Sequence, residues 1–321
     1  MFFITFWRSK STSISSSFNS ADISLSAFKS VLKSFFCSQT WAGEQFIVIA
    51  STTSTVNSGL FKILLPVFTD KTGIAVRVVG VGTGQAIKIA KRGDADLLFV
   101  HHKKSELKFV GNGFGVRRHQ VMYNDFVLVG PKGDPAELRN TETVVSAYKK
   151  IASSKSTFVS RGDDSGTHKT SLEFWQEAIP NRVSLNENKW YREVGAGMGA
   201  TLNIAQEMKG YTLTDRATWE AFLNKESLDL LFDGDPRMRN EYGITMVNPD
   251  LHRHIKVELA SIFIRWIVSK EGQNVINSFR INGKQTFFGN SENISGVSTL
   301  PSALRDRLWS TSFNSDLTTI L

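Results

Sequence analysis

Cysteine is almost missing from this chain of 321 residues, which has Cys37 alone. A single cysteine excludes a disulfide within the chain and a zinc site built from several thiolates. No apolar run is long enough to span a bilayer, so we expect the mature chain to be soluble. The formal net charge is +8, but lysine and arginine do not gather into blocks with interleaved aromatic residues. We therefore expect no nucleic-acid partner.

Patterns typical of catalytic or metal-ligating residues are also scarce. The histidines at 101–102 and 252–254 have no matching carboxylate pattern beside them. Ser165 and His168 could form a nucleophile and base, but the G-x-S-x-G turn of such hydrolases is absent. We predict that the chain is not an enzyme and holds neither a metal ion nor a cofactor. A hydrolase that uses Ser165 and His168 is kept as an alternative from another class.

The segment 1–43 differs in composition from the rest, being rich in Ser and Phe and poor in acids. Two basic residues precede a mixed apolar stretch, 23–36, and Thr40-Trp-Ala42 offers small residues that suit a signal peptidase. Lysines interrupt the apolar stretch, so the segment is an atypical export signal or a plain N-terminal extension. We predict export and a periplasmic location.

From residue 45 onward, short apolar runs alternate with segments of helical spacing. Phe46–Ala50 has the composition of a strand buried on both faces. The pattern continues with strands at 74–81 and 96–100 and helices at 59–68, 85–91, 257–268 and 271–276. This alternation predicts an α/β fold with mixed, mainly parallel sheets covered by helices. Ligands of such folds bind at the carboxyl ends of the strands.

Two further strands, Met122–Pro131 and Tyr242–Pro249, each end in proline after apolar alternation. They bracket a section with its own strand–helix units. We interpret them as two crossover strands that form a hinge between two lobes. The predicted lobes are 44–124 plus 245–290 for the first and 125–244 for the second. No role is predicted for the tail, 291–321.

Five strand-to-helix turns are rich in Gly, Ser and Thr, at 47–54, 78–85, 158–168, 194–201 and 211–216. A helix start has unpaired backbone N–H groups and the positive end of the helix dipole, so it favours an anion. Several such turns in one α/β chain predict a pocket that holds an oxyanion mainly with neutral donors. Only the turn at 158–168 adds a cation within the loop, Arg161.

The Arg161 loop, Arg161-Gly-Asp-Asp-Ser-Gly-Thr167, combines close backbone approach at glycine, hydroxyl donors and a guanidinium fork for two oxygens. The predicted ligand contacts in it are Ser160, Arg161, Ser165, Gly166 and Thr167. The alternative is structural: Asp164 or Ser165 caps the helix, and Arg161 pairs with Asp163.

The other turns contribute further candidates. Ser51–Thr55 has more hydroxyls than one cap requires, and Thr53 and Ser54 are its predicted contacts. Thr83 and Gly84 lie in a Gly-rich turn that lacks the Lys-Ser/Thr end of a P-loop. Gly195–Ala200 matches the dinucleotide pattern G-x-G-x-x-A, which leaves a dinucleotide-dependent enzyme as an alternative. We favour a helix start at which the N–H groups of Gly199 and Ala200 face an anion.

Residues 46–288 resemble the tungstate-binding proteins of ABC importers, a branch of the periplasmic type II solute-binding proteins. The resemblance rests on stretches that follow in order along the chain: Ala50-Ser-Thr-Thr-Ser-Thr55, Val81-Gly-Thr-Gly-Gln-Ala86, Gly93-Asp-Ala-Asp96, Met122-Tyr-Asn-Asp-Phe-Val127, 158–168, Gly197-Met-Gly-Ala-Thr-Leu-Asn203, Tyr211-Thr-Leu-Thr-Asp-Arg216 and Glu271-Gly-Gln273.

The resemblance implies a two-lobed, monomeric receptor that hands tungstate, and molybdate as a second candidate, to an ABC permease of the inner membrane. The family's Thr-Thr-Ser turn falls on Thr52, Thr53 and Ser54. The Arg161 loop also resembles that of phosphate-binding receptors of the same fold, which keeps phosphate as an alternative. Asp163 distinguishes them, because a carboxylate aimed into the site could accept a proton from hydrogen phosphate. If Asp163 instead pairs with Arg161 or caps the helix, tungstate is favoured.

Overall fold

The computed structural model describes residues 45–180 and 185–291. The predicted export segment 1–43 and the tail after residue 291 lie outside the described residues. The described residues all belong to one compact unit. None of its described helices is both long and apolar enough to cross a membrane.

The first part of the fold is a parallel β–α–β arrangement. Strand β1 (Phe46–Thr52) lies between β2 (Ala75–Val81) and β3 (Leu97–Val100), and both ladders are parallel. The helices that follow these strands are α2 (Thr53–Asn57), α3 (Leu60–Thr72), α4 (Thr83–Lys91) and α5 (Lys103–Gly111). The parallel strands bring their carboxyl ends to one edge, so the turns at Thr52 and Gly82 lie near each other.

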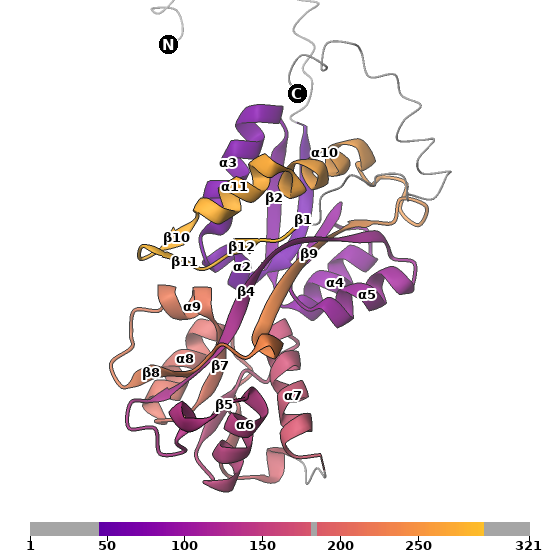
Figure 1. Cartoon of the computed structure of the whole chain (residues 1–321). Helices are drawn as coiled ribbons and strands as arrows, with labels where there is room; N and C mark the ends of the chain where they lie inside the picture. The colour runs from indigo at the N-terminus through magenta and orange to yellow at the C-terminus, as the bar shows by residue number, and fades with distance from the viewer. Residues whose placement is uncertain (1–44, 181–184, 292–321) are drawn as a thin grey trace, which may run out of the picture. The chain divides into compact units, whose positions relative to one another are not determined.

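The long strand β4 (Gly115–Pro131) pairs with two different sets of strands along its length (Figure 1). Its first part pairs with β9 (Arg239–Val247) and β12 (Phe288–Gly289), and its last residues pair with β7 (Thr212–Asp215) and β8 (Leu228–Phe232). β4 and β9 are thus antiparallel neighbours that run between the two halves of the fold, with Asn124 opposite Asn240. The prediction of crossover strands is confirmed, and both strands begin earlier than the apolar pattern indicated.

The sheets are mixed, as predicted, but parallel pairing does not dominate among the described strands. Three ladders are parallel, including β5 (Phe158–Ser160) with β6 (Tyr191–Glu193), and six are antiparallel. A crossover helix keeps two strands parallel, whereas β4 and β9 return between the halves and oppose their neighbours. The expectation of mainly parallel sheets is therefore corrected.

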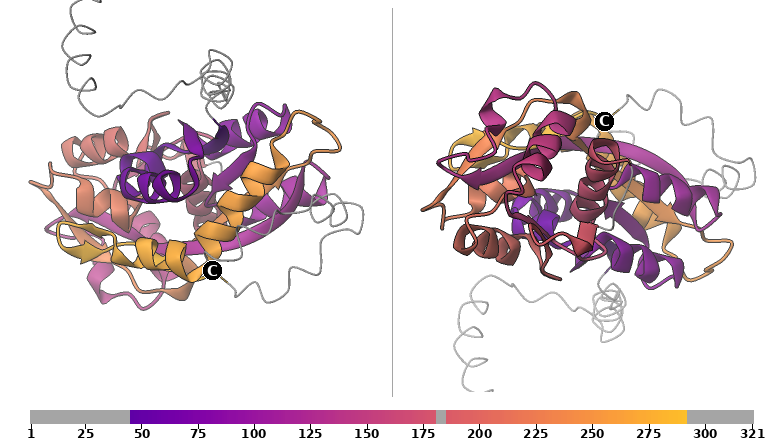
Figure 2. Two further views of the ribbon diagram at one scale, coloured as in Figure 1. Left: turned by 90° about the horizontal axis from the view of Figure 1, so that it is seen from above. Right: turned by 90° about the horizontal axis from the view of Figure 1, so that it is seen from below.

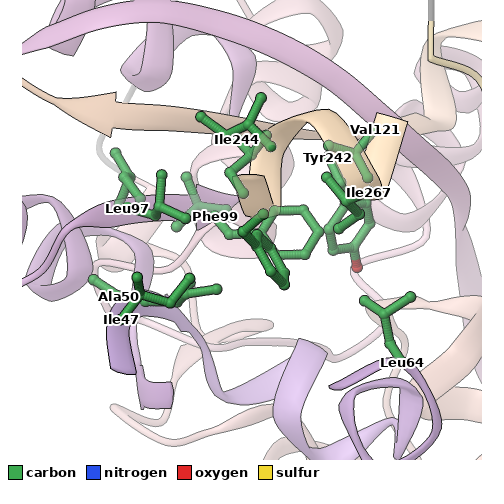
Figure 3. Packing of buried hydrophobic residues seen from close by; sticks show 14 of the residues in the cluster. Ile47, Ala50, Leu64, Leu97, Phe99, Val121, Tyr242, Ile244 and Ile267 are labelled. Atoms are coloured by element: carbon green, nitrogen blue, oxygen red, sulfur yellow. The ribbon is translucent and has the colours of Figure 1, made fainter. Parts of the chain in front are cut away.

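The core around β1 and β3 joins both ends of the described chain. Figure 3 shows Ile47, Phe99 and Tyr242 packed with Leu64 of α3 and Ile267 of α10 (Val257–Val268). Helices α10 and α11 (Lys270–Ser278) pack against each other and against β4, as the orange pair beside the purple strand in Figure 2 shows. The late helices therefore complete the core begun by the first strands.

A separate core lies on each side of the last part of β4. Phe126 and Leu128 point into a cluster around Trp175, while Val127 and Val129 point into a cluster with Leu202. This division follows from the two-residue repeat of a strand, which sends alternate side chains to opposite faces. The helices of this half are α6 (Val144–Ser153), α7 (Gly166–Ala178), α8 (Met198–Glu207) and α9 (Arg216–Ala221). The remaining short elements are β10 (Arg280–Ile281), β11 (Lys284–Gln285) and 3-10 turns at Leu138–Asn140, Leu185–Glu187 and Pro236–Met238.

Candidate functional site

Each of the five predicted turns leads from a strand into a helix, but their caps differ. Gly82 and Gly197 begin α4 and α8 without a side-chain cap, so the first N–H groups of these helices have no side-chain acceptor from the cap residue. Thr52 and Ser165 cap α2 and α7 with hydroxyls. Asp215 caps α9 and accepts hydrogen bonds from the backbone and hydroxyl of Thr218. The start of α9 is therefore already occupied by a negative charge, the carboxylate of Asp215.

A cleft of about 430 Å³ lies beside the turn after β1. Its walls are formed by Thr53, Ser54, Asn57 and Ser58, by Gly197, Met198, Gly199 and Ala200, and by Thr218, Ala221 and Phe222. Hydroxyls and the uncapped start of α8 thus share one space with a few apolar side chains. Four predicted contacts, Thr53, Ser54, Gly199 and Ala200, come together here.

The hydroxyls of the β1 turn are linked to one another. The Thr52 Oγ1 atom lies 3.1 Å from Ser54 Oγ and 2.7 Å from Thr55 Oγ1. It also accepts the backbone N–H of Thr55, which makes it the cap of α2. Thr52 therefore stabilises the turn through hydrogen bonds within it, whereas Thr53 and Ser54 line the cleft.

Arg161 is buried, with 5% of its surface exposed, in the loop between β5 and α7. Its Nη2 atom donates to Asp163 Oδ2 over 2.6 Å. Asp163 also accepts from the hydroxyl of Ser165 over 2.5 Å. The loop has the structural arrangement considered as the alternative for its sequence, since Ser165 caps α7 and Arg161 pairs with Asp163.

Two buried polar atoms of the same loop lack a hydrogen-bond partner among the described residues: Arg161 Nε and Thr167 Oγ1. Both side chains, with Ser160, line a second pocket that has no volume left for a water molecule. A buried donor without a partner costs roughly 1–3 kcal/mol, so it is rare unless something satisfies it. The described residues leave the hydrogen-bonding capacity of these two atoms unused.

The turn before α4 touches the Arg161 loop directly. The Gly84 N–H donates to the carbonyl of Asp164, and the Gly166 N–H donates to Thr83 Oγ1, both over 3.0 Å. A Cβ atom at Gly84 would lie 1.4 Å from the Asp164 carboxylate, so a side chain at this position would have to displace that carboxylate, which is 58% exposed. Thr83, Gly84 and Gly166 therefore hold two loops together, and none of the three lines the cleft.

Ser160 and His168 form a pair beside the loop. The Ser160 hydroxyl lies 3.0 Å from His168 Nδ1, which also accepts the Gly162 N–H. Burial lowers the pKa of His168, and nearby Glu193 partly opposes this. The ring of His168 therefore bonds to Ser160, while its backbone N–H bonds to the Ser165 hydroxyl. The proposed Ser165–His168 nucleophile and base do not face each other.

His101 is a residue whose place in the site the sequence reasoning missed. It follows β3, and its Nε2 atom lies 3.1 Å from Ser54 Oγ. Burial lowers its pKa to about 4, although Asp215 acts in the opposite direction. A histidine immediately after a buried parallel strand was the available signal, because ligands of such folds bind at that end of the strands.

Residues 38–271 match the model of the PBP superfamily domain. The tungstate-binding protein TupA of Peptoclostridium acidaminophilum is 45% identical over 244 residues, which are 75% of this chain and 82% of that protein. The solved tungstate-binding protein TupA of Desulfovibrio alaskensis G20 is 41% identical, with a TM-score of 0.69, covering 77% of this chain and all of that one. The tungstate ABC transporter structure from Geobacter sulfurreducens is 45% identical, with a TM-score of 0.67, covering 74% of this chain and 99% of the other.

The fold and these matches define the class as a solute-binding protein with a PBP superfamily domain. Within that class, the chain belongs to the family of the TupA tungstate-binding proteins. The family expected from the sequence motifs is thereby confirmed.

Proposed function

We propose that this protein is the substrate-binding component of an ABC importer and that it traps tungstate, with molybdate as the second candidate, as a tetrahedral oxyanion. The observation that carries the proposal is the pair of unpartnered buried donors, Arg161 Nε and Thr167 Oγ1, in a protein of this family. Neutral hydroxyls and N–H groups at Ser54, Gly199 and Ala200 supply further donors at the cleft. The chemistry is binding alone, and no catalytic residue is proposed.

The full proposed ligand set is Thr52, Thr53, Ser54, Thr83, Gly84, Ser160, Arg161, Ser165, Gly166, Thr167, Gly199 and Ala200. Its members lie in the cleft, in the filled pocket and in the contact between the loops. We propose that they converge on the anion when the two lobes adjust around it. The two crossover strands supply the hinge for such an adjustment.

Tungstate is proposed over phosphate because of Asp163. The Asp163 carboxylate pairs with Arg161 and accepts from Ser165, so its oxygens are occupied within the loop. A receptor for hydrogen phosphate would need an acceptor free to take the ligand's proton. Tungstate has no proton to donate at neutral pH, and it requires donors only.

Calorimetric titration with tungstate, molybdate, sulfate and phosphate tests the proposal. We expect tight binding of tungstate and no binding of phosphate. At a tungstate concentration of about 100 times Kd, the free energy of unfolding should rise by about 2.7 kcal/mol. NAD added in place of the anion should leave stability unchanged. Tight phosphate binding without tungstate binding would show that the assignment is wrong.

Ala200→Asp is expected to separate binding from stability. Ala200 lies in the first turn of α8 and lines the cleft. A carboxylate there favours the helix by about 0.3–1 kcal/mol but repels an anion in the cleft. We expect tungstate affinity to fall by about tenfold or more, with unfolding by urea unchanged or slightly delayed. Ala200→Asn, which has the same shape without the charge, should keep most of the affinity, and equal loss in both variants would contradict the charge argument.

We further propose that the two lobes comprise 44–124 plus 245–290 and 125–244. The separate cores support this division, because one gathers side chains from 47–122 and 242–287 together with Ala217, and the others gather side chains from 126–238. We also propose export to the periplasm through 1–43, a monomeric state and an ABC permease as partner. A fusion of residues 1–50 to a reporter, followed by cell fractionation, tests the export step.

A further inference from the structure

Five buried side chains from separate parts of the chain form one line of hydrogen bonds that begins at the cleft. Ser54 Oγ lies 3.1 Å from His101 Nε2, and His101 Nδ1 lies 3.0 Å from Asn240 Oδ1. Asn240 Nδ2 donates to Asn124 Oδ1 over 2.7 Å, and Asn124 Nδ2 donates to Asp215 Oδ1 over 3.4 Å. The line therefore passes from the cleft wall through both crossover strands to the cap of α9.

Asp215, the last member of this line, determines which group is the donor in each of its hydrogen bonds. A carboxylate only accepts hydrogen bonds, and Asp215 already accepts from Thr218. Asn124 must therefore present its NH₂ group to Asp215 and its oxygen to Asn240. Asn240 in turn presents its oxygen to His101, so the neutral ring of His101 carries its proton on Nδ1.

This tautomer determines what Ser54 can do. With the proton on Nδ1, the Nε2 atom has a lone pair and accepts the proton of the Ser54 hydroxyl. A hydroxyl has only one proton, so Ser54 cannot donate to His101 and to an anion in the cleft at the same time. If Ser54 turns its proton toward the anion, its oxygen faces the lone pair of Nε2, which is repulsive unless that nitrogen gains a proton.

The charges near the site also favour a proton on His101 Nε2 when an anion is bound. Arg161 is buried and paired with Asp163, so the positive charge of the loop is already balanced. A dianion enclosed beside this pair would be under-compensated, and burying an unpaired charge is costly. One proton added to His101 would supply a positive charge next to Ser54 and offset one of the two negative charges.

We propose that His101 is a positioning residue that takes up a proton from solvent when the cleft binds a doubly charged oxyanion. The added proton sits on Nε2 and donates to Ser54 Oγ, while the Ser54 hydroxyl donates to the anion. The inference rests on the proposed function, since it requires an oxyanion at Ser54. It goes further by assigning a coupling between anion and proton to a residue outside the predicted ligand set.

The surroundings of His101 set the direction of this coupling. Arg161, the neighbouring His102 and the start of α7 at Gly166 disfavour a charge on the ring, whereas Asp215 favours it. Tyr242 stacks on the ring with centroids 4.8 Å apart, and Asn240 accepts from it. Burial keeps the pKa of His101 near 4 in the free protein, and a bound dianion raises it. Affinity should therefore increase as the pH falls below the bound-state pKa, and the increase should end near the free-state pKa.

Titration calorimetry of the full chain with sodium tungstate in two buffers of different ionisation enthalpy measures the coupling. At near-neutral pH we expect uptake of up to about one proton per tungstate bound, and up to about tenfold tighter binding for each pH unit lowered. Binding whose heat does not depend on the buffer would overturn the inference and leave the proposed function intact. Absence of tungstate binding would overturn the proposed function itself.

Substitutions assign the proton to its residue. His101→Gln and Ser54→Ala should each bind tungstate more weakly and without proton uptake. Because two variants test the same assignment, it can still be tested if one of them does not fold. His119→Gln is the matched control, because His119 is a partly buried histidine whose pKa burial also lowers to about 4, and no hydrogen bond within the described part of the chain joins its side chain to the line. It should keep the uptake. If His168→Gln abolishes the uptake and His101→Gln does not, the assignment to His101 is wrong.

Discussion

Arg161→Ala is expected to weaken tungstate binding by about a hundredfold or more. A hydrogen bond to a charged group contributes roughly 1.5–3 kcal/mol, and the guanidinium can present more than one. The variant also leaves Asp163 as an unpaired carboxylate beside the anion, since Arg161 Nη2 is its present partner. Both effects act in the same direction, and isothermal titration with tungstate measures their sum.

Two further variants separate these effects. Arg161→Lys keeps a charge but loses the planar fork, so its affinity should lie between those of the parent and the alanine variant. Arg161→Ala combined with Asp163→Asn removes both charges of the pair. If this double variant binds as tightly as the parent, Arg161 serves only to neutralise Asp163. If Arg161→Ala alone binds as the parent does, the Arg161 loop is not the anion site.

The loop also shows why sequence reasoning left two interpretations open. Capping of α7 by Ser165 and ion pairing by Arg161 were considered as a structural alternative to ligand binding, and both are present. They do not exclude the binding role, because Arg161 Nε and Thr167 Oγ1 still have no partner among the described residues. The same residue types suit helix capping and ligand binding. The two roles can be distinguished only by seeing which polar atoms already have a hydrogen-bond partner in the folded protein.

The parallel half of the fold could be predicted because its pattern is local. β1 and β3 are continuous apolar runs, and each is followed by a helix with its own spacing. The first half of β4 was missed because Arg117, Arg118 and His119 interrupt the apolar alternation. The Arg118 side chain is nevertheless only 8% exposed, and it pairs with Glu106 of α5. Burial of a charge through a partner on another element leaves no trace in a local pattern.

The residues of the His101 line were missed for a related reason. Asn124 and Asn240 are ordinary polar residues in sequence, and His101 lies 139 positions from its partner Asn240. Their significance arises only when β4 and β9 pair in a register that places the two asparagines opposite each other. Strand register depends on contacts far apart in the chain, so a local sequence pattern does not specify it.

Arg118→Ala is expected to destabilise the protein by about 1–3 kcal/mol, because it leaves the buried Glu106 carboxyl without its hydrogen-bonding and charge partner. The Arg118 Nε and Glu106 Oε2 atoms are 2.6 Å apart, and the two side chains are 8% and 1% exposed. A Cβ at Gly243 of β9 would lie 2.0 Å from Glu106 Oε2, so β9 packs directly against the pair. Urea unfolding of the variant and the parent measures the difference.

The pH dependence of that loss follows from Glu106. Burial raises its pKa to about 7 even with Arg118 present, so the fold favours the protonated carboxyl. Its contribution to the free energy of unfolding therefore declines as the pH rises from the ordinary carboxyl pKa of 4.5 toward 7. Removing Arg118 raises that pKa further, so the defect of Arg118→Ala should be smaller in mild acid than at neutral pH.

Two controls test whether the buried charge is the cause. Combining Arg118→Met with Glu106→Gln removes both charges and should restore much of the lost stability and remove the pH dependence. Lys103→Ala breaks the nearby pair with Glu241, in which the lysine side chain is 53% exposed, and should cost no more than about 1 kcal/mol. Equal losses for Lys103→Ala and Arg118→Ala would contradict the argument, because exposure is the main difference between the two pairs.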